Sequence, residues 1–226
     1  KDILWFHTVI WPAILFAIGV EQANKVFAHG WWLSDKDTKI GKSAGNAMDL
    51  DYLISTYGAD SLRYFLFRST PFGEDGDFSE SALIDRHNNE LANKLGNLVS
   101  RVSALAEKKK KKKTKIALSS DKAIKAVEKY MQNYEFDKAL NEIFAFIDKC
   151  NEYVQEKKPW ETHDKKVLYE LSNAIKDIAI LLNPFIPETS EKIAKTFNFN
   201  ISLESLKEPL KISKIIKSPI LFNKIE

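Results

Sequence analysis

The chain has 226 residues, of which 44% are hydrophobic and 12% aromatic, enough to bury the core of one large or two small domains. Its net charge is +3, but the six consecutive lysines at 108–113 carry more positive charge than this total. The rest of the chain is therefore slightly acidic. This balance excludes a uniformly basic nucleic-acid-binding surface, and any contact with nucleic acid must be local. The single cysteine, Cys150, excludes an internal disulfide and a multi-cysteine zinc site, as expected for a cytoplasmic protein. Its place in an apolar series predicts core packing for Cys150.

The first twenty residues form an almost continuous apolar run. Residues 3–20 are nearly as long as a membrane span, which leaves a membrane anchor or a signal sequence as alternatives. His7, Thr8 and Pro12 interrupt the run, and Asp2 can cap a helix that ends at Gly19. The sequence therefore predicts a buried helix over residues 2–19, kinked or started at Pro12.

A strand and a glycine-containing loop are predicted next. Residues 25–32 predict a short strand, and residues 39–46 form a loop whose two lysines and two glycines suit phosphate binding. A helix, a strand and a phosphate-type loop are typical of the last part of an α/β nucleotide-binding unit. Because a parallel sheet needs neighbouring strands, these residues predict only the C-terminal remnant of a Rossmann-type domain.

The rest of the chain predicts helices. Residues 71–79 predict a loop, and residues 200–226 give no clear pattern. The lysine run at 108–113 predicts a solvated connection, with contact to RNA as the alternative. The predicted fold class is mainly α, with a catalytic-domain remnant at 1–48, a connecting segment at 49–78 and a helical bundle at 79–226. Caps and apolar periodicity predict helices at 49–57, 60–69, 79–107, 121–133, 136–158, 164–183 and 188–197.

Several short motifs are similar, in order, to one protein family. Lys39-Ile-Gly-Lys-Ser43 resembles the Lys-Met-Ser-Lys-Ser signature of class I aminoacyl-tRNA synthetases, with Gly41 in place of the usual serine. The flanks of this loop, the Gly58-Ala-Asp-Ser-Leu-Arg63 segment and Asp77-Phe-Ser79 resemble the methionyl branch of that family. This ordering is more specific than any single motif.

The resemblance implies an ATP-dependent chemistry for the first part of the chain. The co-substrate would be ATP with Mg²⁺. Lys42 and Lys39 would stabilise the charge that develops on the departing pyrophosphate when methionine is activated. Phe6 and His7 would line the methionine pocket, although His7 also fits a core histidine and Asp2 a simple helix cap. The residues implied to bind the nucleotide are Asp2, His29, Gly30 and Ser43, and the resemblance implies no metal site within the chain.

Two family features are missing from the chain. The four histidines cannot form the His-Ile-Gly-His type motif that contacts the ATP phosphates, and the cysteine-rich zinc insertion is absent. Both lie upstream in the family. The chain therefore resembles the C-terminal half of the enzyme, and we expect it to need an N-terminal half, as a separate subunit or as the remainder of one polypeptide, to activate methionine.

A second group of residues is suited to reading RNA. Asn97 and Arg101 are four residues apart and face the same way on a helix, with Asn93 one turn earlier. Their amide and guanidinium groups can contact the edges of unstacked bases, and Trp160, which follows Pro159 at a helix end, can stack on one. The resemblance implies that these residues recognise the CAU anticodon of tRNA(Met). A solvated polar stripe and a core tryptophan are the alternatives.

Three other functions remain open from the sequence. The chain fits a part of another class I synthetase, such as the leucyl, isoleucyl, valyl or cysteinyl enzyme, because these share the lysine loop. It also fits a non-catalytic helical RNA-binding module or a membrane-anchored protein. Lys158-Pro-Trp160 favours the methionyl family and hence a cytoplasmic, tRNA-binding protein.

Overall fold

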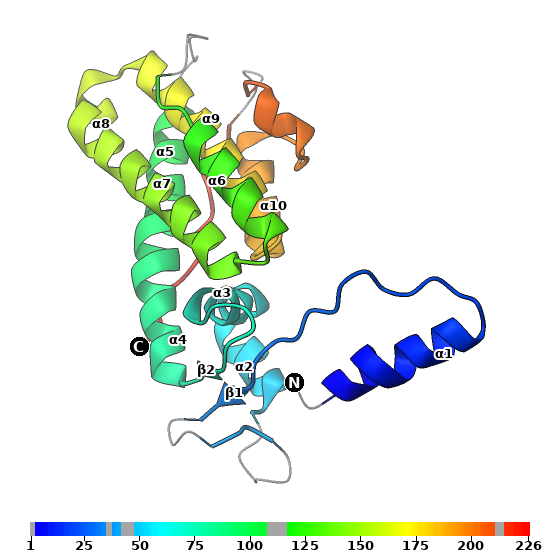
Figure 1. Ribbon diagram of the computed structural model, residues 1–226. Helices are drawn as coiled ribbons and strands as arrows, with labels where there is room; N and C mark the ends of the chain where they lie inside the picture. Colours follow the sequence, from blue (N-terminus) through cyan, green and yellow to red (C-terminus); the bar gives the residue numbers. More distant parts are fainter. Residues whose placement is uncertain (1–2, 35–37, 42–47, 108–116, 211–214) are drawn as a thin grey trace.

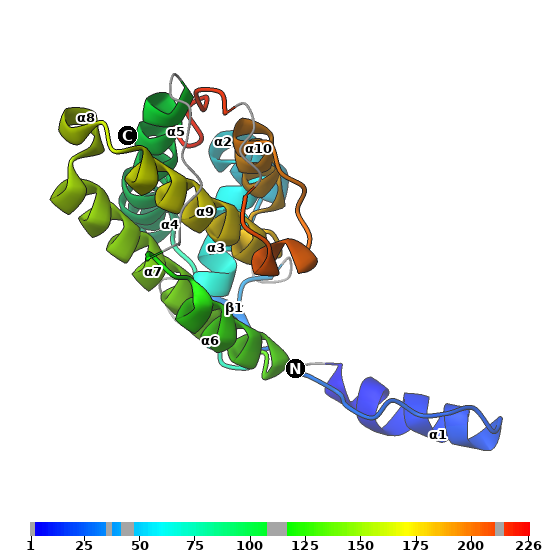
Figure 2. The same ribbon diagram turned by 90° about the horizontal axis from the view of Figure 1, so that it is seen from above.

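The computed structural model describes residues 3–34, 38–41, 48–107, 117–210 and 215–226, and it confirms a mainly α-helical fold. A bundle of helices forms the body, α2 and α3 lie at one end of it beside a small sheet, and α1 projects away as an arm (Figures 1 and 2). The α-helices are α1 (Trp11–Ala17), α2 (Leu50–Tyr57), α3 (Ala59–Ser69), α4 (Glu80–Arg86), α5 (Asn97–Glu107), α6 (Asp121–Gln132), α7 (Phe136–Lys157), α8 (Pro159–Thr162), α9 (Lys165–Leu182) and α10 (Pro187–Phe197). The strands are β1 (Trp32–Leu33) and β2 (Gly76–Asp77), and the π- and 3₁₀-helical segments are η1 (Phe6–Ile10), η3 (His87–Gly96) and η4 (Glu204–Lys207).

One long helix runs through α4, η3 and α5 (Figure 1). Ser79 caps it, because its hydroxyl oxygen accepts the Ala82 N–H at 3.3 Å. The predicted helix over residues 79–107 is confirmed, but its middle third is π-helical, with N–H groups bonded five residues back. Apolar spacing did not predict the π-helical segment. A π-helical segment changes which backbone groups are hydrogen-bonded, and apolar spacing indicates only which side chains are buried.

Helix α9 lies at the centre of the core. Every residue from Val167 to Leu182 is buried, as expected for a helix surrounded by other helices. Its buried polar groups hold the surrounding irregular segments. The Glu170 carboxylate accepts from the Tyr153 hydroxyl and from the Ala117 N–H, and the Asn173 carbonyl oxygen accepts the Leu210 N–H at 2.6 Å.

Cys150 lies in this core, fully buried on α7, so its predicted packing role is confirmed. Burial raises the pKa of its thiol to about 12. At pH 8 the thiolate fraction is then about one in ten thousand, against about a quarter for an unfolded chain with the ordinary pKa of about 8.5.

We expect iodoacetamide to leave Cys150 unmodified in the native chain and to alkylate it in urea, as measured by intact mass. Rapid stoichiometric alkylation of the native chain would contradict this.

The predicted helix over residues 2–19 is confirmed for residues 4–17, but its predicted burial is wrong. Helical residues run from Leu4 through η1 and α1, and the arm is mostly exposed: Trp5 is 64% exposed and Phe16 is 77% exposed, while Leu15 is buried. The arm projects from the bundle, so its apolar side chains have little to pack against (Figures 1 and 2). None of the described helices has both the length and the apolar character needed to cross a membrane.

The predicted strand over residues 25–32 is also wrong in extent. Residues 25–31 have no regular structure, and only Trp32 and Leu33 form β1, which pairs in parallel with β2 inside the predicted loop. The pairs are Trp32 with Gly76 and Leu33 with Asp77. A strand exists only where a partner offers backbone hydrogen bonds, and here that partner is two residues long.

Helix α3 joins the connecting segment to the bundle. The Arg63 guanidinium donates to the carbonyls of Pro184 at 2.8 Å and Phe185 at 3.0 Å, just after the end of α9. Asp60 accepts the Thr189 N–H at 2.6 Å in the first turn of α10. One turn of α3 therefore satisfies backbone groups on both sides of the α9–α10 turn.

Candidate nucleic-acid interface

Two segments that are distant in sequence meet at one end of the bundle. Helix α7 ends at Lys157. The next residue, Lys158, has a left-handed φ of 43° that redirects the chain, and Pro159 opens the short helix α8. This turn places the Trp160 ring beside the first turns of α5, where the Arg101 guanidinium carbon lies 5.2 Å from the ring centroid. The structure thus brings together two of the predicted RNA-binding residues.

The Arg101–Trp160 pair is partly accessible. Trp160 is half-buried against the core, and its indole N–H donates to the Glu161 carboxylate at 3.3 Å. Arg101 is also half-buried, and a guanidinium held over an indole ring is a cation–π arrangement. Pro159 is buried, so it contributes by starting α8 and not as exposed surface.

Asn97 lies one turn before Arg101 on α5 and is exposed. Its side-chain nitrogen Nδ2 donates to the carbonyl of Asn93 at 2.9 Å, one turn further back. Asn93, Asn97 and Arg101 therefore form the polar stripe that the spacing predicted, and the stripe leads to Trp160.

The catalytic-type residues are only partly described. Asp2, Lys42 and Ser43, like residues 108–113, lie outside the described residues. Lys39 forms an isolated antiparallel bridge with Leu33, and its Nζ lies 4.8 Å from the centroid of the Trp31 ring.

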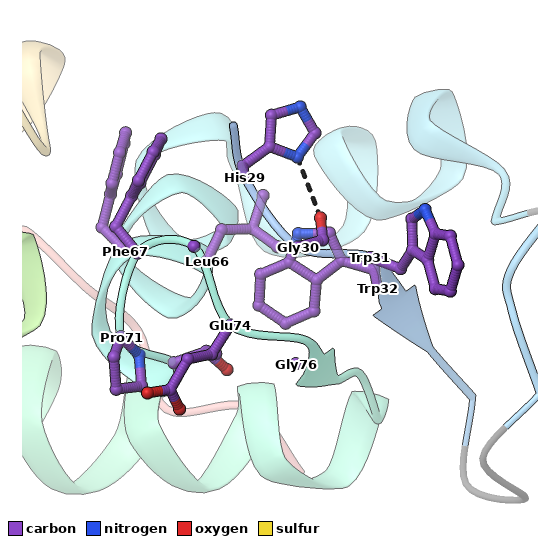
Figure 3. Close-up of a pocket in the computed structure, with 12 residues that line it drawn as sticks. His29, Gly30, Trp31, Trp32, Leu66, Phe67, Pro71, Glu74 and Gly76 are labelled. Atoms are coloured by element: carbon purple, nitrogen blue, oxygen red, sulfur yellow. Dashed lines mark hydrogen bonds between the residues drawn. The ribbon is translucent and has the colours of Figure 1, made fainter. Parts of the chain in front are cut away.

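A small cavity of about 150 Å³ lies beside β1, between residues 29–32 and the α3–β2 connection (Figure 3). His29 is exposed at its edge, and its Nδ1–H donates to the Gly30 carbonyl at 2.9 Å. A Cβ on Gly30 would lie 1.9 Å from the Glu74 carbonyl oxygen, so only glycine allows this approach of the two backbones.

The two implied methionine-pocket residues lie elsewhere. Phe6 and His7 belong to η1 in the projecting arm, where Phe6 is 57% exposed. The His7 Nδ1–H donates to the Ile3 carbonyl at 3.0 Å, and His7 is exposed, so it is not the core histidine that was the alternative. Among the described residues, the arm and the β1 region do not form one methionine and nucleotide site. The described residues also contain no group of three or more His, Cys, Asp or Glu side chains that could hold a metal ion.

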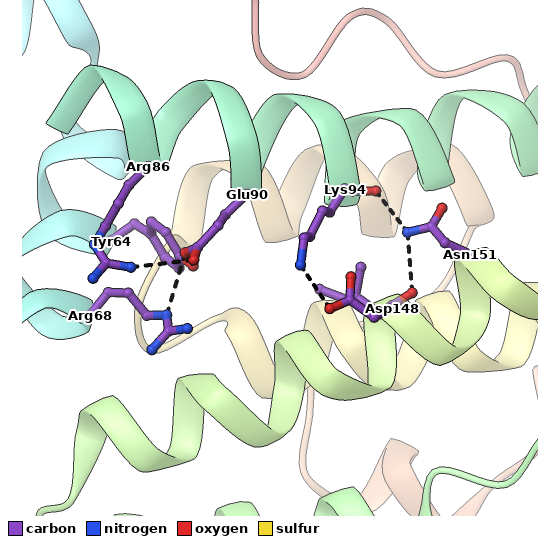
Figure 4. Close-up of polar contacts among 8 residues, drawn as sticks. Tyr64, Arg68, Arg86, Glu90, Lys94, Asp148 and Asn151 are labelled. Carbon is purple, nitrogen blue, oxygen red and sulfur yellow. Dashed lines mark hydrogen bonds and ion pairs between the residues drawn. The ribbon is translucent and has the colours of Figure 1, made fainter. Parts of the chain in front are cut away.

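The sequence did not predict the polar contacts that fix the long helix (Figure 4). Glu90 on η3 accepts from the Tyr64 hydroxyl and pairs with two arginines, Arg86 at 3.3 Å and Arg68 at 3.4 Å. Burial and this carboxylate raise the pKa of the Tyr64 hydroxyl. The four-residue spacing of Arg86 and Glu90 was the one local signal, because Tyr64 and Arg68 come from α3.

A second set of contacts joins η3 to α7 (Figure 4). Lys94 Nζ lies 2.8 Å from the Asp148 carboxylate, and Asn151 Nδ2 donates to the Lys94 carbonyl at 3.3 Å. Helix α7 leads directly to Trp160, and η3 leads directly to Asn97. These contacts therefore connect the two halves of the candidate site.

Comparisons with known proteins match both parts of the chain. A family model described as "tRNA synthetases class I (M)" matches residues 1–103, and one described as "Anticodon-binding domain of tRNA ligase" matches residues 114–220. The chain is 38% identical over 250 residues to the methionine–tRNA ligase of Caldanaerobacter subterraneus and 37% identical over 254 residues to that of Bacillus subtilis. In both cases all of this chain is covered, but only 39% and 38% of the relative.

Solved structures give the same result. Mycobacterium tuberculosis methionyl-tRNA synthetase in complex with methionyl-adenylate matches 98% of this chain with a TM-score of 0.88 and 29% identity, and its apo form matches 100% with a TM-score of 0.87 and 26% identity. The chain covers 48% of each. The chain belongs to the class I methionyl-tRNA synthetase family and spans well under half the length of the curated relatives it matches.

Proposed function

We propose that the chain is the tRNA-binding part of a methionine–tRNA ligase and recognises the CAU anticodon of tRNA(Met). The observation that carries the proposal is the Arg101–Trp160 pair, 5.2 Å apart at the end of the bundle and one turn from the exposed Asn97. An unstacked base can stack on such an aromatic and guanidinium surface, and the polar stripe can then contact its edge. Asn93 accepts the Asn97 side chain within the polar stripe, and Pro159 opens the short helix α8 that carries Trp160.

The proposal also includes a catalytic contribution. The lysine loop, with Lys42 and Lys39, would act on ATP and Mg²⁺ during methionine activation, with Asp2, His29, Gly30 and Ser43 near the nucleotide and Phe6 and His7 near methionine. These roles need the remaining part of the catalytic domain, as a separate subunit or in the same polypeptide. The division into 1–48, 49–78 and 79–226 and a cytoplasmic location belong to the same proposal.

The exposed arm supports the proposal that this chain contacts the remaining part of the catalytic domain. Trp5, Trp11 and Phe16 are more than half exposed, and large apolar side chains that gather on one projecting element are typical of an interaction surface. The matched relatives are more than twice as long as this chain, so they contain the additional residues that such a surface could contact.

Binding of tRNA(Met), compared with the same tRNA carrying a changed anticodon, tests the proposal. Both affinities are measured at one near-physiological salt concentration, because phosphate contacts alone vary steeply with salt. We expect the chain to prefer the CAU anticodon by at least about tenfold, since one mismatched contact of this kind typically costs over 1 kcal/mol. Equal affinities would overturn anticodon recognition and leave only attraction to phosphate.

A further inference from the structure

A column of aromatic rings joins the two matched parts of the chain. The Phe27 ring stacks on the rings of Phe72 and Tyr134, with 4.5 Å between ring centroids in both pairs. Phe72 also meets the Phe136 ring edge-on at 5.2 Å. Phe27 and Phe72 belong to the part matched as a class I synthetase, whereas Tyr134 and Phe136 belong to the part matched as an anticodon-binding domain. These four rings, the aromatic column, therefore connect one part to the other.

Tyr134 has a backbone conformation that its own side chain does not favour. It lies in the turn between α6 and α7 with a φ of 61°, a left-handed region that suits glycine or asparagine better than a bulky residue. The Glu135 N–H closes this turn by donating to the Tyr130 carbonyl at 2.9 Å. The ring of Tyr134 contacts Phe27, and Lys25 Nζ lies 5.2 Å from its centroid. Contacts with residues 25–27 thus explain a tyrosine where local preference predicts a smaller residue.

The column supports a segment that has little structure of its own. Residues 21–31 form neither helix nor strand, and they lead directly into β1. Strand β1 pairs with β2 over only two residue pairs, a ladder too short to be stable alone. Leu33 of β1 forms the bridge to Lys39, and the Ile40 N–H donates to the Trp32 carbonyl at 3.1 Å. The place of Lys39 therefore depends on β1, which needs support beyond its own hydrogen bonds.

We propose that Phe27 is a positioning residue that fixes β1, and with it Lys39, against the α6–α7 turn of the bundle. This inference rests on the proposed role of Lys39 in methionine activation and identifies the contact that keeps Lys39 in place. Cations that stabilise a departing pyrophosphate must be placed before the reaction, and a displacement of about 1 Å can cost on the order of a hundredfold in rate. Phe27 acts through β1 and does not itself touch the substrate.

Backbone hydrogen exchange of the chain, followed by mass spectrometry, tests the positioning. The reporting amides are those of Ile40, Gly76 and Phe78, which donate to carbonyls in or next to β1. We expect Phe27→Ala to speed their exchange by about tenfold, because an aromatic pair contributes about this factor to an equilibrium constant. Amides of the buried helix α9 should exchange as in the native chain.

Two further variants test whether the stacked rings are responsible. Tyr134→Ala removes the other side of the contact and should speed exchange of the same three amides. Phe27→Tyr keeps the ring, and the added hydroxyl can be accommodated because Phe27 is 43% exposed, so this variant should retain native exchange. Faster exchange in Phe27→Tyr equal to that in Phe27→Ala would overturn the proposal.

Tyr52→Ala is the matched control. Tyr52 is 47% exposed, close to the value for Phe27, and its ring meets that of Tyr57 at 6.4 Å on α2, beside the small sheet but outside the aromatic column. Tyr52→Ala should leave the three amides unchanged. If Phe27→Ala and Tyr52→Ala have equal effects, or if exchange in α9 rises as much as in β1, the rings act only on general stability and the proposal is overturned.

Methionine-dependent exchange of pyrophosphate into ATP, measured with the complete enzyme, separates this proposal from the function on which it rests. We expect Phe27→Ala to lower kcat by about tenfold and to leave the KM for methionine unchanged, and Phe27→Tyr to retain activity. If Lys39→Ala lowers kcat and Phe27→Ala does not, the positioning role is overturned and the catalytic role of Lys39 stands. If Lys39→Ala keeps the native rate, the catalytic role falls, and hydrogen exchange alone decides whether Phe27 fixes β1.

Discussion

Replacing Glu90 by glutamine is expected to lower the free energy of unfolding by about 2 to 3 kcal/mol. Glu90 is paired with Arg68 and Arg86 and accepts from the Tyr64 hydroxyl, and its side chain is only 19% exposed. Glutamine keeps the size but removes the charge, so the Arg68 guanidinium, 16% exposed, loses its carboxylate partner in a partly desolvated place. Urea unfolding followed by circular dichroism measures the change.

Asp148→Asn is the control for Glu90→Gln. It removes the α7 carboxylate that pairs with Lys94 of the same long helix, at a shorter distance of 2.8 Å. Both partners are about 40% exposed, however, so this variant should change stability by less than about 0.5 kcal/mol. Equal losses for the two variants would mean that burial of the Glu90 cluster does not determine its strength.

Helix ends could be predicted from the sequence because their signals are local. Asp49 caps α2 by accepting the Tyr52 N–H at 3.0 Å, and Gly58 ends that helix with a φ of 82°. Asp164 caps α9 in the same way. Each of these contacts involves residues within one turn, so the residue types alone predict them.

Whether the arm is buried or exposed could not be predicted in this way. The apolar run shows that residues 3–20 need a partner surface, but the sequence does not contain the position of that surface. The structure shows Trp5 and Phe16 exposed, whereas the periodic apolar residues of α5 and α7 are buried. Composition predicts the need for burial, and only tertiary packing decides whether it occurs.

The candidate site was predictable in part. Asn97 and Arg101 follow from four-residue spacing, but the contact of Arg101 with Trp160 depends on the left-handed turn at Lys158. The resemblance to the methionyl family, and not periodicity, placed these residues together in the prediction. The sequence has four arginines, at 63, 68, 86 and 101, and each of them makes a specific contact in the structure.

Replacing Trp160 by alanine is expected to weaken binding of a CAU stem-loop by about tenfold to a hundredfold and to remove the preference over a changed anticodon. In the proposed site the ring is the stacking surface, and without it Arg101 loses its cation–π contact. Affinity for the changed anticodon should fall much less, because phosphate attraction remains. Fluorescence anisotropy of labelled stem-loops at fixed salt measures both constants.

Two further variants separate stacking from general destabilisation. Trp160→Phe keeps an aromatic ring and most of the core contact but loses the N–H bonded to Glu161, so it should retain most of the preference. Tyr130→Ala removes another ring that lies under a cation, with Lys138 Nζ 6.0 Å away, beside the opposite end of α7. Tyr130→Ala should leave anticodon preference unchanged. If Tyr130→Ala and Trp160→Ala reduce the preference equally, the effect is one of folding, and Trp160 does not contact the RNA.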